Sequence, residues 1–443
     1  MPRTLLMLSY YYPPLGGIGA QRSLKLARHL PRFGWRAIVV TPDVGSYALD
    51  RSLEDETEVV RTGSLELPRL LRTVLARVRP GVLPEGSVEP ADSPAVEGHG
   101  RIRRLIRTWM YIPDPCIGWL PFARRAAMDA ARNADAVFST SSPATAHLAA
   151  RAVARRRSIP WIADYRDLWT RSHYPFYDSR LRLAIDRRLE GGVLRDADAV
   201  TTVSAAWRDD LARGQVSPER FFVVPNGYDP EDFAGLPEPE PRRAPPTAAD
   251  PFVLMYAGLF YGRRQDPRPL FDALDRLFAD GIVARDAFRV RLYGAPDPYV
   301  LAVAGELGLG DVVESMGFRP HAETLAAQRG ADALWLIVRD DPRSIGHIPG
   351  KVFEYLGAGR PILAQAPADG EVARLVRRAA AGVVAPGNDP LALDKALRRL
   401  CAGELKGASG EARLEHSRER GAERVARILD ALVEGRGFPA EFR

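Results

Sequence analysis

A lysine and a glutamate lie three residues apart in the segment GKVFEYLGAGRPILA, residues 350–364. On a helix, Lys351 and Glu354 share one face. Gly350 marks the helix start, where the dipole favours an anionic ligand such as a diphosphate. The Glu354 carboxylate can accept hydrogen bonds from sugar or ribose hydroxyls. Composition alone favours an ordinary amphipathic helix with solvated charges, but the rest of the chain reverses that preference.

A glycine-rich loop with two arginines follows the apolar stretch PFVLMYAG in the same half of the chain. In AGLFYGRR, residues 257–264, Gly258 and Gly262 allow the backbone to approach a ligand closely. Arg263 and Arg264 end the loop, and guanidinium groups suit bidentate contact with phosphate. The segment predicts a phosphate site with either arginine as the contact. A solvated basic loop is the alternative.

Near the N-terminus, Gly16, Gly17 and Arg22 follow the first apolar stretch, in YYPPLGGIGAQR. The dinucleotide-binding motif G-x-G-x-x-G is incomplete here, because Arg22 occupies the position of its last glycine. The acidic residue that such a site needs at the end of the second strand is also missing before Thr41. A nicotinamide site is therefore not expected. Arg22 lies on the first helical turn, where it could meet a phosphate or an acceptor group. A solvated arginine fits the pattern equally well.

Two further polar groups follow apolar stretches in the first half. In ADYRDLW, Arg166 and Asp167 come directly after a predicted strand, and Asp167 could orient an acceptor hydroxyl. A local ion pair between the two is the alternative. Asn226 begins an Asn-Gly turn in VVPNGYDPEDF. This turn is expected to be structural first, with ligand contact as the lesser interpretation.

The elements that position these residues form two similar halves. Residues 4–9, 20–34 and 36–42 read as strand, helix and strand, which predicts a parallel sheet. The second half restarts in the same way at residue 252. We therefore expect an α/β fold of two Rossmann-like, doubly wound domains that face each other across a cleft. The predicted parts are a domain at 1–235 with a mobile insertion at about 80–100, a Pro-rich linker at 236–251, a domain at 252–416, and a C-terminal helix at 417–443.

Composition limits the function classes. The chain has 443 residues, a formal net charge of +6 and two cysteines. A disulfide framework and a cysteine-rich metal site are excluded, which fits a cytoplasmic protein. No nucleic-acid-binding signature occurs, so no nucleic-acid partner is expected. Residues 101–113, RIRRLIRTWMYIP, alternate basic and apolar residues. They predict peripheral contact with an anionic membrane on its inner face, with a packed surface helix as the alternative.

Taken in order, these motifs resemble a known family. YYPPLGGIGAQR, ADYRDLW, VSAAW, VVPNGYDPEDF, MYAGLFYGRR and PGKVFEYLGAGRPILA together look like the retaining GT-B-fold glycosyltransferases of family 4. The resemblance covers most of the chain except residues 80–100 and the linker. It implies a nucleoside-diphosphate sugar donor and a sugar, lipid-linked or small-molecule acceptor, with no metal cofactor. Many bacterial relatives build polysaccharide, lipopolysaccharide or glycosylated natural products.

The resemblance also implies roles for the residues above. The leaving phosphate itself would accept the proton of the acceptor hydroxyl, in an attack on the same face of the sugar. One position departs from the pattern, since Gly346 stands where the family often has the first glutamate of a Glu-x7-Glu pair. This departure leaves the donor sugar open. The implied residues are Arg263, Lys351 and Asp167 for catalysis, Gly258, Arg264, Glu354 and Gly350 for the donor, and Gly16, Gly17, Arg22, Arg166 and Asn226 for the acceptor.

Two other functions remain open. A sugar-nucleotide 2-epimerase shares the expected fold, but it needs side chains for proton removal and elimination, and no carboxylate-histidine set is evident. A non-catalytic nucleotide-sugar-binding scaffold is supported by Gly346. An assay without acceptor separates the epimerase from the transferase, because an epimerase converts the UDP-sugar alone.

Overall fold

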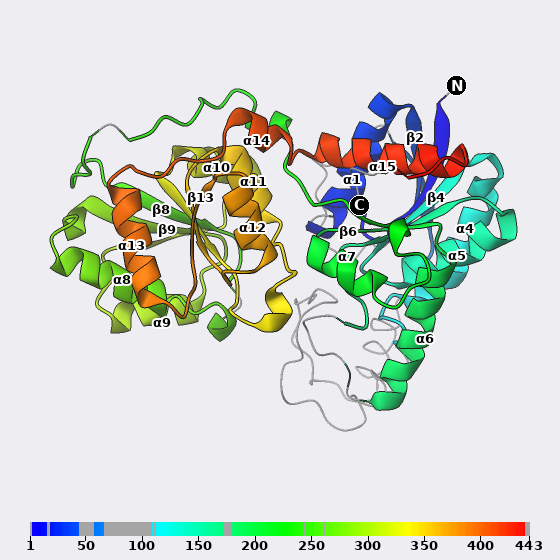
Figure 1. Cartoon of the computed structure of the whole chain (residues 1–443), viewed down its shortest axis with the longest axis horizontal. Coiled ribbons are helices and arrows are strands. Elements are labelled where there is room, and N and C mark those ends of the chain that lie inside the picture. The colour runs from blue at the N-terminus through cyan, green and yellow to red at the C-terminus, as the bar shows by residue number, and fades with distance from the viewer. Residues whose placement is uncertain are drawn as a thin grey trace, which may run out of the picture. The chain divides into compact units, whose positions relative to one another are not determined.

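The computed structural model describes residues 2–15, 18–43, 57–65, 109, 111–171, 177, 179–242, 244–260 and 262–438 (Figure 1). The predicted insertion at 80–100 and the glycines at 16 and 17 lie outside these residues, as does most of the segment 101–113. The chain divides into two compact units, Met1–Pro225 with Gly421–Arg443, and Asn226–Arg420. Within the described residues, no helix has the length and apolar character needed to cross a membrane.

The described part of the first unit contains a parallel sheet in the order β3-β2-β1-β4-β5-β6-β7. The strand order reverses between β1 and β4, where a doubly wound sheet places its ligand crevice. The strands are β1 (Arg3–Leu8), β2 (Trp35–Pro42), β3 (Glu58–Thr62), β4 (Ala136–Ser141), β5 (Trp161–Tyr165), β6 (Ala199–Thr202) and β7 (Phe221–Val223).

Helices cover both faces of this sheet. One apolar core contains side chains from α4, α5, α6 and α7, and the other contains side chains from α1 and α15. The central strands are buried on both faces, which explains their nearly continuous apolar sequences. The helices are α1 (Ile18–His29), η1 (Leu30–Phe33), η3 (Ile117–Trp119), α4 (Leu120–Ala130), η4 (Ala131–Asn133), α5 (Thr145–Arg157), α6 (Arg180–Asp196), α7 (Ala205–Ala212), η5 (Pro218–Arg220) and α15 (Arg418–Val433).

The second unit has a parallel sheet in the order β10-β9-β8-β11-β12-β13 within its described residues. Its order reverses between β8 and β11. Helices α8, α9 and α13 lie on one face of the sheet and α11 and α12 on the other (Figure 1), and their apolar side chains form two separate cores. The strands are β8 (Phe252–Ala257), β9 (Phe288–Tyr293), β10 (Val313–Gly317), β11 (Ala333–Ile337), β12 (Ile362–Gln365) and β13 (Gly382–Ala385).

The helices of the second unit alternate with these strands, as a parallel sheet requires. The apolar stretch PFVLMYAG contains β8, and the apolar end of GKVFEYLGAGRPILA forms most of β12. The helices are η6 (Pro230–Phe233), η7 (Gly262–Arg264), α8 (Arg268–Ala279), η8 (Arg285–Ala287), α9 (Pro298–Glu306), α10 (His321–Gly330), η9 (Pro342–Ser344), α11 (Lys351–Ala358), α12 (Glu371–Arg378), α13 (Pro390–Cys401) and α14 (Gly410–Leu414).

The division between the units differs from the predicted boundary at residue 235. Tyr228 and Phe233 are buried in a core of the second unit. The Tyr228 amide donates to the carbonyl oxygen of His416 at 3.3 Å. Further along, the Arg242 guanidinium pairs with Asp332 at 2.9 Å. The segment expected to end the first domain and the predicted linker therefore both belong to the second unit.

The C-terminal helix also differs from its expected status as a separate segment. From Gly421 onward, α15 belongs to the first unit, where Val425, Ile428 and Leu429 are buried. Asp430 accepts hydrogen bonds from the Arg3 guanidinium at 2.6 Å and from Trp35 Nε1 at 3.0 Å. The end of the chain thus completes the core of the unit formed by its beginning.

Candidate functional site

Lys351 and Gly258 meet at the carboxyl end of β8, beside the point where the strand order of the second sheet reverses. Gly258 follows β8 with φ +120°, a conformation that favours glycine. A Cβ atom at this position would lie 2.7 Å from Lys351 Nζ. The glycine therefore allows the lysine ammonium to approach the backbone of the loop.

The Lys351 side chain is held by an aromatic ring rather than by a carboxylate. Its Nζ atom donates to Tyr256 Oη at 2.6 Å and lies 4.0 Å from the centre of that ring. Tyr256 in turn donates to the carbonyl oxygen of Leu259 at 2.8 Å. Burial lowers the pKa of Lys351 to about 7, although nearby Glu354 opposes the shift. An anionic ligand would supply the counter-charge that this lysine lacks among the described residues.

The N-terminus of α11 is fixed against β8. Tyr355 Oη accepts a hydrogen bond from the backbone amide of Ala257 at 2.8 Å. Gly359 ends the helix in the left-handed conformation, with φ 72°, which favours glycine. Gly350, the N-cap residue, adds no side-chain hydrogen bond. Lys351 therefore projects from a helix that the Tyr355 hydroxyl fixes to the end of β8.

Arg263 provides a second cation on the loop after β8. Its guanidinium lies 5.4 Å from the ring centre of Tyr299, on α9. It is exposed and makes no ion pair with the described residues. Asp297 ties the loop to α9, because its carboxylate accepts from the amides of Gly262 at 3.3 Å and Tyr299 at 2.9 Å. The Arg264 side chain lies outside the described part of the chain.

Glu354 lies on the first turn of α11 and is half-buried. Its Oε1 atom is 3.3 Å from His321 Nε2, at the start of α10. No other hydrogen bond to its carboxylate occurs among the described residues. In the segment before α11, Gly346 is buried and places no carboxylate there. Burial lowers the pKa of neighbouring His347 to about 4, so this histidine is neutral near pH 7.

In the first unit, Arg166 contacts the backbone rather than Asp167. It donates to the carbonyl oxygens of Ser141 at 2.8 Å and Ser142 at 2.5 Å, and to that of Gly19. The alternative of a local ion pair with Asp167 is not realised. Burial raises the pKa of Asp167, with Arg166 opposing the shift. The Asp167 carboxylate accepts no hydrogen bond from the described residues and remains a candidate for orienting an acceptor hydroxyl.

Arg22 has a different environment from the one its position on the first helical turn suggested. It donates to both carboxylate oxygens of buried Asp164, at 3.0 and 2.7 Å. It also donates to the carbonyl oxygens of Pro225 at 3.1 Å and Val224 at 2.9 Å. These contacts join α1, β5 and the end of β7. Arg22 is thus a structural residue of the first unit in this conformation, since its donors are used internally.

Comparison with known proteins gives these arrangements a context. Residues 16–227 match the model of the glycosyl transferase 4-like domain. The chain is 31% identical over 266 residues to a D-inositol 3-phosphate glycosyltransferase of Geodermatophilus obscurus. The aligned region covers 57% of this chain and 55% of the relative. The domain match and this identity support a glycosyltransferase of family 4. A second relative from Catenulispora acidiphila, the D-inositol 3-phosphate glycosyltransferase 1, is 28% identical over 56% of this chain and 61% of its own.

The chain thus spans little more than half the length of these relatives. Solved structures are similar over nearly all of it. The Anabaena protein HepE, in complex with UDP and glucose, gives a TM-score of 0.59 at 15% identity, over 97% of this chain and 100% of that one. The apo lipopolysaccharide outer core galactosyltransferase WaaB gives 0.56 at 13% identity, over 98% and 99%. These similarities confirm the predicted GT-B fold.

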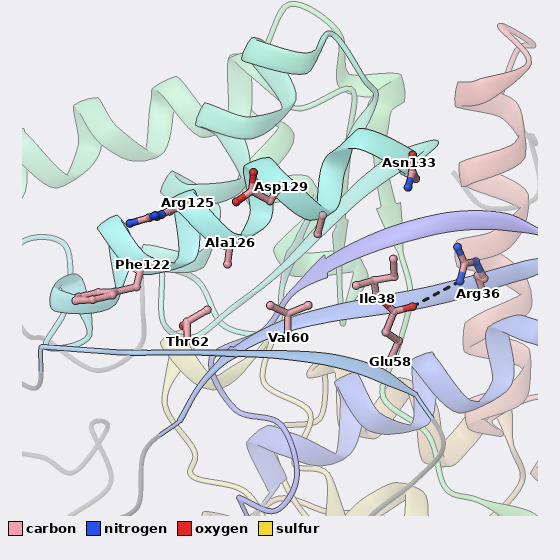
Figure 2. A pocket seen from close by; sticks show the side chains of 11 residues that line it. Arg36, Ile38, Glu58, Val60, Thr62, Phe122, Arg125, Ala126, Asp129 and Asn133 are labelled. Atoms are coloured by element: carbon pink, nitrogen blue, oxygen red, sulfur yellow. Dashed lines mark ion pairs between the residues drawn. The ribbon is translucent and has the colours of Figure 1, made fainter.

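A hollow of about 550 Å³ lies elsewhere, in the first unit (Figure 2). It lies between α4 and the outer strands β2 and β3, and an ion pair of 3.5 Å between Arg36 and Glu58 crosses its rim. None of the predicted site residues lines it. Its lining residues are Arg36, Ile38, Glu58, Val60, Thr62, Phe122, Arg125, Ala126, Asp129, Ala130 and Asn133.

Sequence reasoning missed four residues that contact the loop after β8, the two cations or Glu354. Tyr256 sits in an apolar strand and reads as core, while Asp297 and Tyr299 read as an ordinary helix cap and turn. His321 has no motif of its own. One signal was present, since Asp297-Pro298 is a helix-start pattern directly after a strand. Asn226, expected near the acceptor, is the first residue of the second unit.

Proposed function

We propose that this chain is a retaining glycosyltransferase that moves a sugar from a nucleoside-diphosphate donor to an acceptor hydroxyl. The observation that carries the proposal is Lys351, a half-buried ammonium without a carboxylate partner among the described residues, at the end of β8. Exposed Arg263, on the loop after β8, adds a second cation. The names of the relatives support a glycosyltransferase.

The donor would bind to the second unit. Lys351 and Arg263 would contact the diphosphate, and Gly258 would let the backbone come close to it. Glu354 would accept hydrogen bonds from the ribose hydroxyls. The carboxyl end of β8, beside the reversal of strand order, is where open parallel sheets bind ligands.

The chemistry would proceed on one face of the sugar. The bond between the anomeric carbon and the diphosphate oxygen breaks while the acceptor oxygen bonds to the same carbon. The proton of the acceptor hydroxyl passes to an oxygen of the leaving phosphate. Fixed cations stabilise charge as it develops on that leaving group. Lys351 and Arg263 would supply this stabilisation, with no metal ion in the proposal.

Asp167 would orient the acceptor in the first unit. Because burial raises its pKa, the carboxylate would gain from a hydroxyl donor that replaces lost water. The relatives are named for D-inositol 3-phosphate, so a phosphorylated polyol is the first acceptor to test. Bacterial polysaccharide, lipopolysaccharide and natural-product glycoside synthesis are the pathways we propose, in the cytoplasm or at the membrane surface.

The function is tested first by nucleotide binding. Purified protein is titrated with UDP, GDP and dTDP by calorimetry and thermal shift. Ligand at about 100 times its dissociation constant should stabilise the folded protein by about 2.7 kcal/mol. Absence of binding by all three nucleotides would contradict the donor site.

Turnover then separates the candidate enzymes. The matching nucleotide sugar is incubated with and without acceptors, and products are followed by NMR. We expect a glycoside with the anomeric configuration of the donor. An inverted product contradicts retention, and conversion of the nucleotide sugar without acceptor indicates an epimerase. Tight nucleotide binding with no turnover on any acceptor indicates a scaffold. The relatives' names make the last two less favoured.

Tyr299 should matter through its ring. Tyr299→Leu removes the aromatic face under Arg263, and we expect UDP affinity to fall about threefold to tenfold, the range of an exposed to partly desolvated cation–π contact. Tyr299→Phe keeps the ring and should keep most of the affinity, although it loses the hydrogen bond to Asp266 at 3.1 Å. Equal losses in both variants, measured by calorimetry, would show that the hydroxyl matters instead.

A further inference from the structure

We propose that His321 is a positioning residue that holds the Glu354 carboxylate toward the nucleotide ribose and away from Lys351. The inference rests on the proposed function, because it assigns a second residue to the same donor site. It concerns a histidine that belongs to none of the motifs recognised in the sequence.

The first observation is that Glu354 does not form an ion pair with Lys351. Lys351 and Glu354 are three residues apart on α11, a spacing at which opposite charges usually attract. Nevertheless, Glu354 makes its described contact with His321, at 3.3 Å, and Lys351 makes its own with Tyr256, at 2.6 Å. The two charges thus remain separately available to a ligand.

The second observation concerns the other oxygen of the Glu354 carboxylate, Oε2. His321 contacts Oε1, while Oε2 accepts no hydrogen bond from the described part of the chain. A carboxylate has lone pairs for about four hydrogen bonds. Because His321 holds Oε1, it also fixes the direction of Oε2. The Oε2 atom can then accept hydrogen bonds from the two adjacent ribose hydroxyls.

The third observation concerns stability. The His321 side chain is 58% exposed and that of Glu354 is 34% exposed. Exposed pairs of this kind contribute little to folding. Loss of His321 should therefore leave the second unit folded, and its consequence should appear in ligand discrimination. Without the imidazole, the flexible Glu354 side chain can turn back to the Lys351 ammonium, which would weaken both the ribose and the diphosphate contacts.

The experiment compares UDP with 2′-deoxy-UDP and 3′-deoxy-UDP by calorimetry, or the GDP series if only GDP binds. We expect the wild type to prefer the ribonucleotide by about tenfold, as a charge-assisted hydrogen bond allows. His321→Ala should reduce the preference to about threefold or less and Glu354→Ala should abolish it. His321→Gln, whose amide reaches a similar position, should restore part of it. Glu323→Ala, an exposed change on the same helix, should have no effect.

The outcomes distinguish a failure of the His321 proposal from a failure of the proposed function. If His321→Ala keeps the full ribose preference while Glu354→Ala loses it, Glu354 is a ribose ligand and His321 does not position it. If the wild type binds no nucleoside diphosphate, the proposed function itself fails. Circular dichroism and thermal unfolding of each variant show whether the second unit remains folded, so a loss of preference cannot be mistaken for unfolding.

Discussion

Lys351→Met should weaken UDP binding by about tenfold to one hundredfold, the range expected when a charge-assisted hydrogen bond to phosphate is removed. The lysine is the half-buried cation of the proposed donor site, and its described side-chain contact is with the ring and hydroxyl of Tyr256. Arg263 is exposed, so its charge is screened by solvent and cannot replace the loss. Sugar transfer should fall further than binding, because in the proposed function the cation also stabilises charge on the leaving diphosphate.

The same variant should fold as well as the wild type. Methionine has a similar length and no charge, while the ammonium that it replaces is partly desolvated. Lys395→Met is the matched control, since Lys395 is exposed on α13 of the same unit. Calorimetry gives the affinity, and thermal unfolding shows that the fold is intact. Unchanged affinity in the Lys351 variant would remove the central residue from the proposed site.

The pKa of Lys351 gives this prediction a pH dependence. Burial lowers the pKa to about 7 in the folded protein, from 10.5 as the ordinary value. The bound diphosphate requires the charged form, so binding above pH 7 takes up a proton. Affinity for UDP should fall by up to about tenfold per pH unit between pH 7.5 and 9, where the phosphate, with a pKa near 6, is already ionised. Lys351→Met should show no such slope.

The pH dependence of folding stability has the opposite sign to that of UDP binding. Between pH 7 and 10.5 the unfolded chain binds the proton more strongly than the folded chain does at this lysine. The contribution of Lys351 to folding therefore becomes more favourable as pH rises through that window. Weakening UDP binding with rising pH, together with unchanged or improved folding, would distinguish this titration from a general loss of structure.

The sequence predicts where the candidate residues of the second unit lie in the fold because the determinants of their positions are local. Gly258 and Lys351 lie beside strand ends, and the pattern of apolar runs, glycines and a helix start determines where such residues must fall. The order of strand and helix likewise predicts parallel sheets. What the sequence does not reveal is contacts between distant segments. Tyr256 and Lys351 meet across 95 positions, and no spacing rule connects them.

The domain boundary shows the same limit. Proline-rich composition predicted a linker at 236–251, but it cannot show that Arg242 pairs with Asp332. Nor can it show that Tyr228 pairs with the chain beside residue 417. In both cases a segment that is irregular by itself is ordered by partners far along the chain. Composition describes what a segment can form alone, and tertiary contacts decide the rest.

Arg22→Ala should destabilise the first unit by about 3–5 kcal/mol, the cost of removing one partner from a buried ion pair. Asp164 is fully buried, and its carboxylate also accepts from Thr140 at 2.8 Å and Thr201 at 2.7 Å. Burial alone would raise the pKa of Asp164, but Arg22 and the two hydroxyls outweigh it and lower the pKa. Without Arg22, a buried charge would remain with hydroxyl donors only.

Denaturant unfolding would be followed by tryptophan fluorescence. Because the two units need not unfold together, Trp335 of the second unit is changed to phenylalanine, so that the signal reports on the first unit. Arg28→Ala, an exposed change on α1, should stay within about 0.5 kcal/mol of the wild type. The stabilisation is present above the ordinary aspartate pKa of 3.8 and is lost as pH falls through the lowered value, so the difference between the variants should shrink in acid. If Arg22→Ala unfolds like Arg28→Ala but loses acceptor binding, the guanidinium serves a ligand, as its position on the first helical turn suggested.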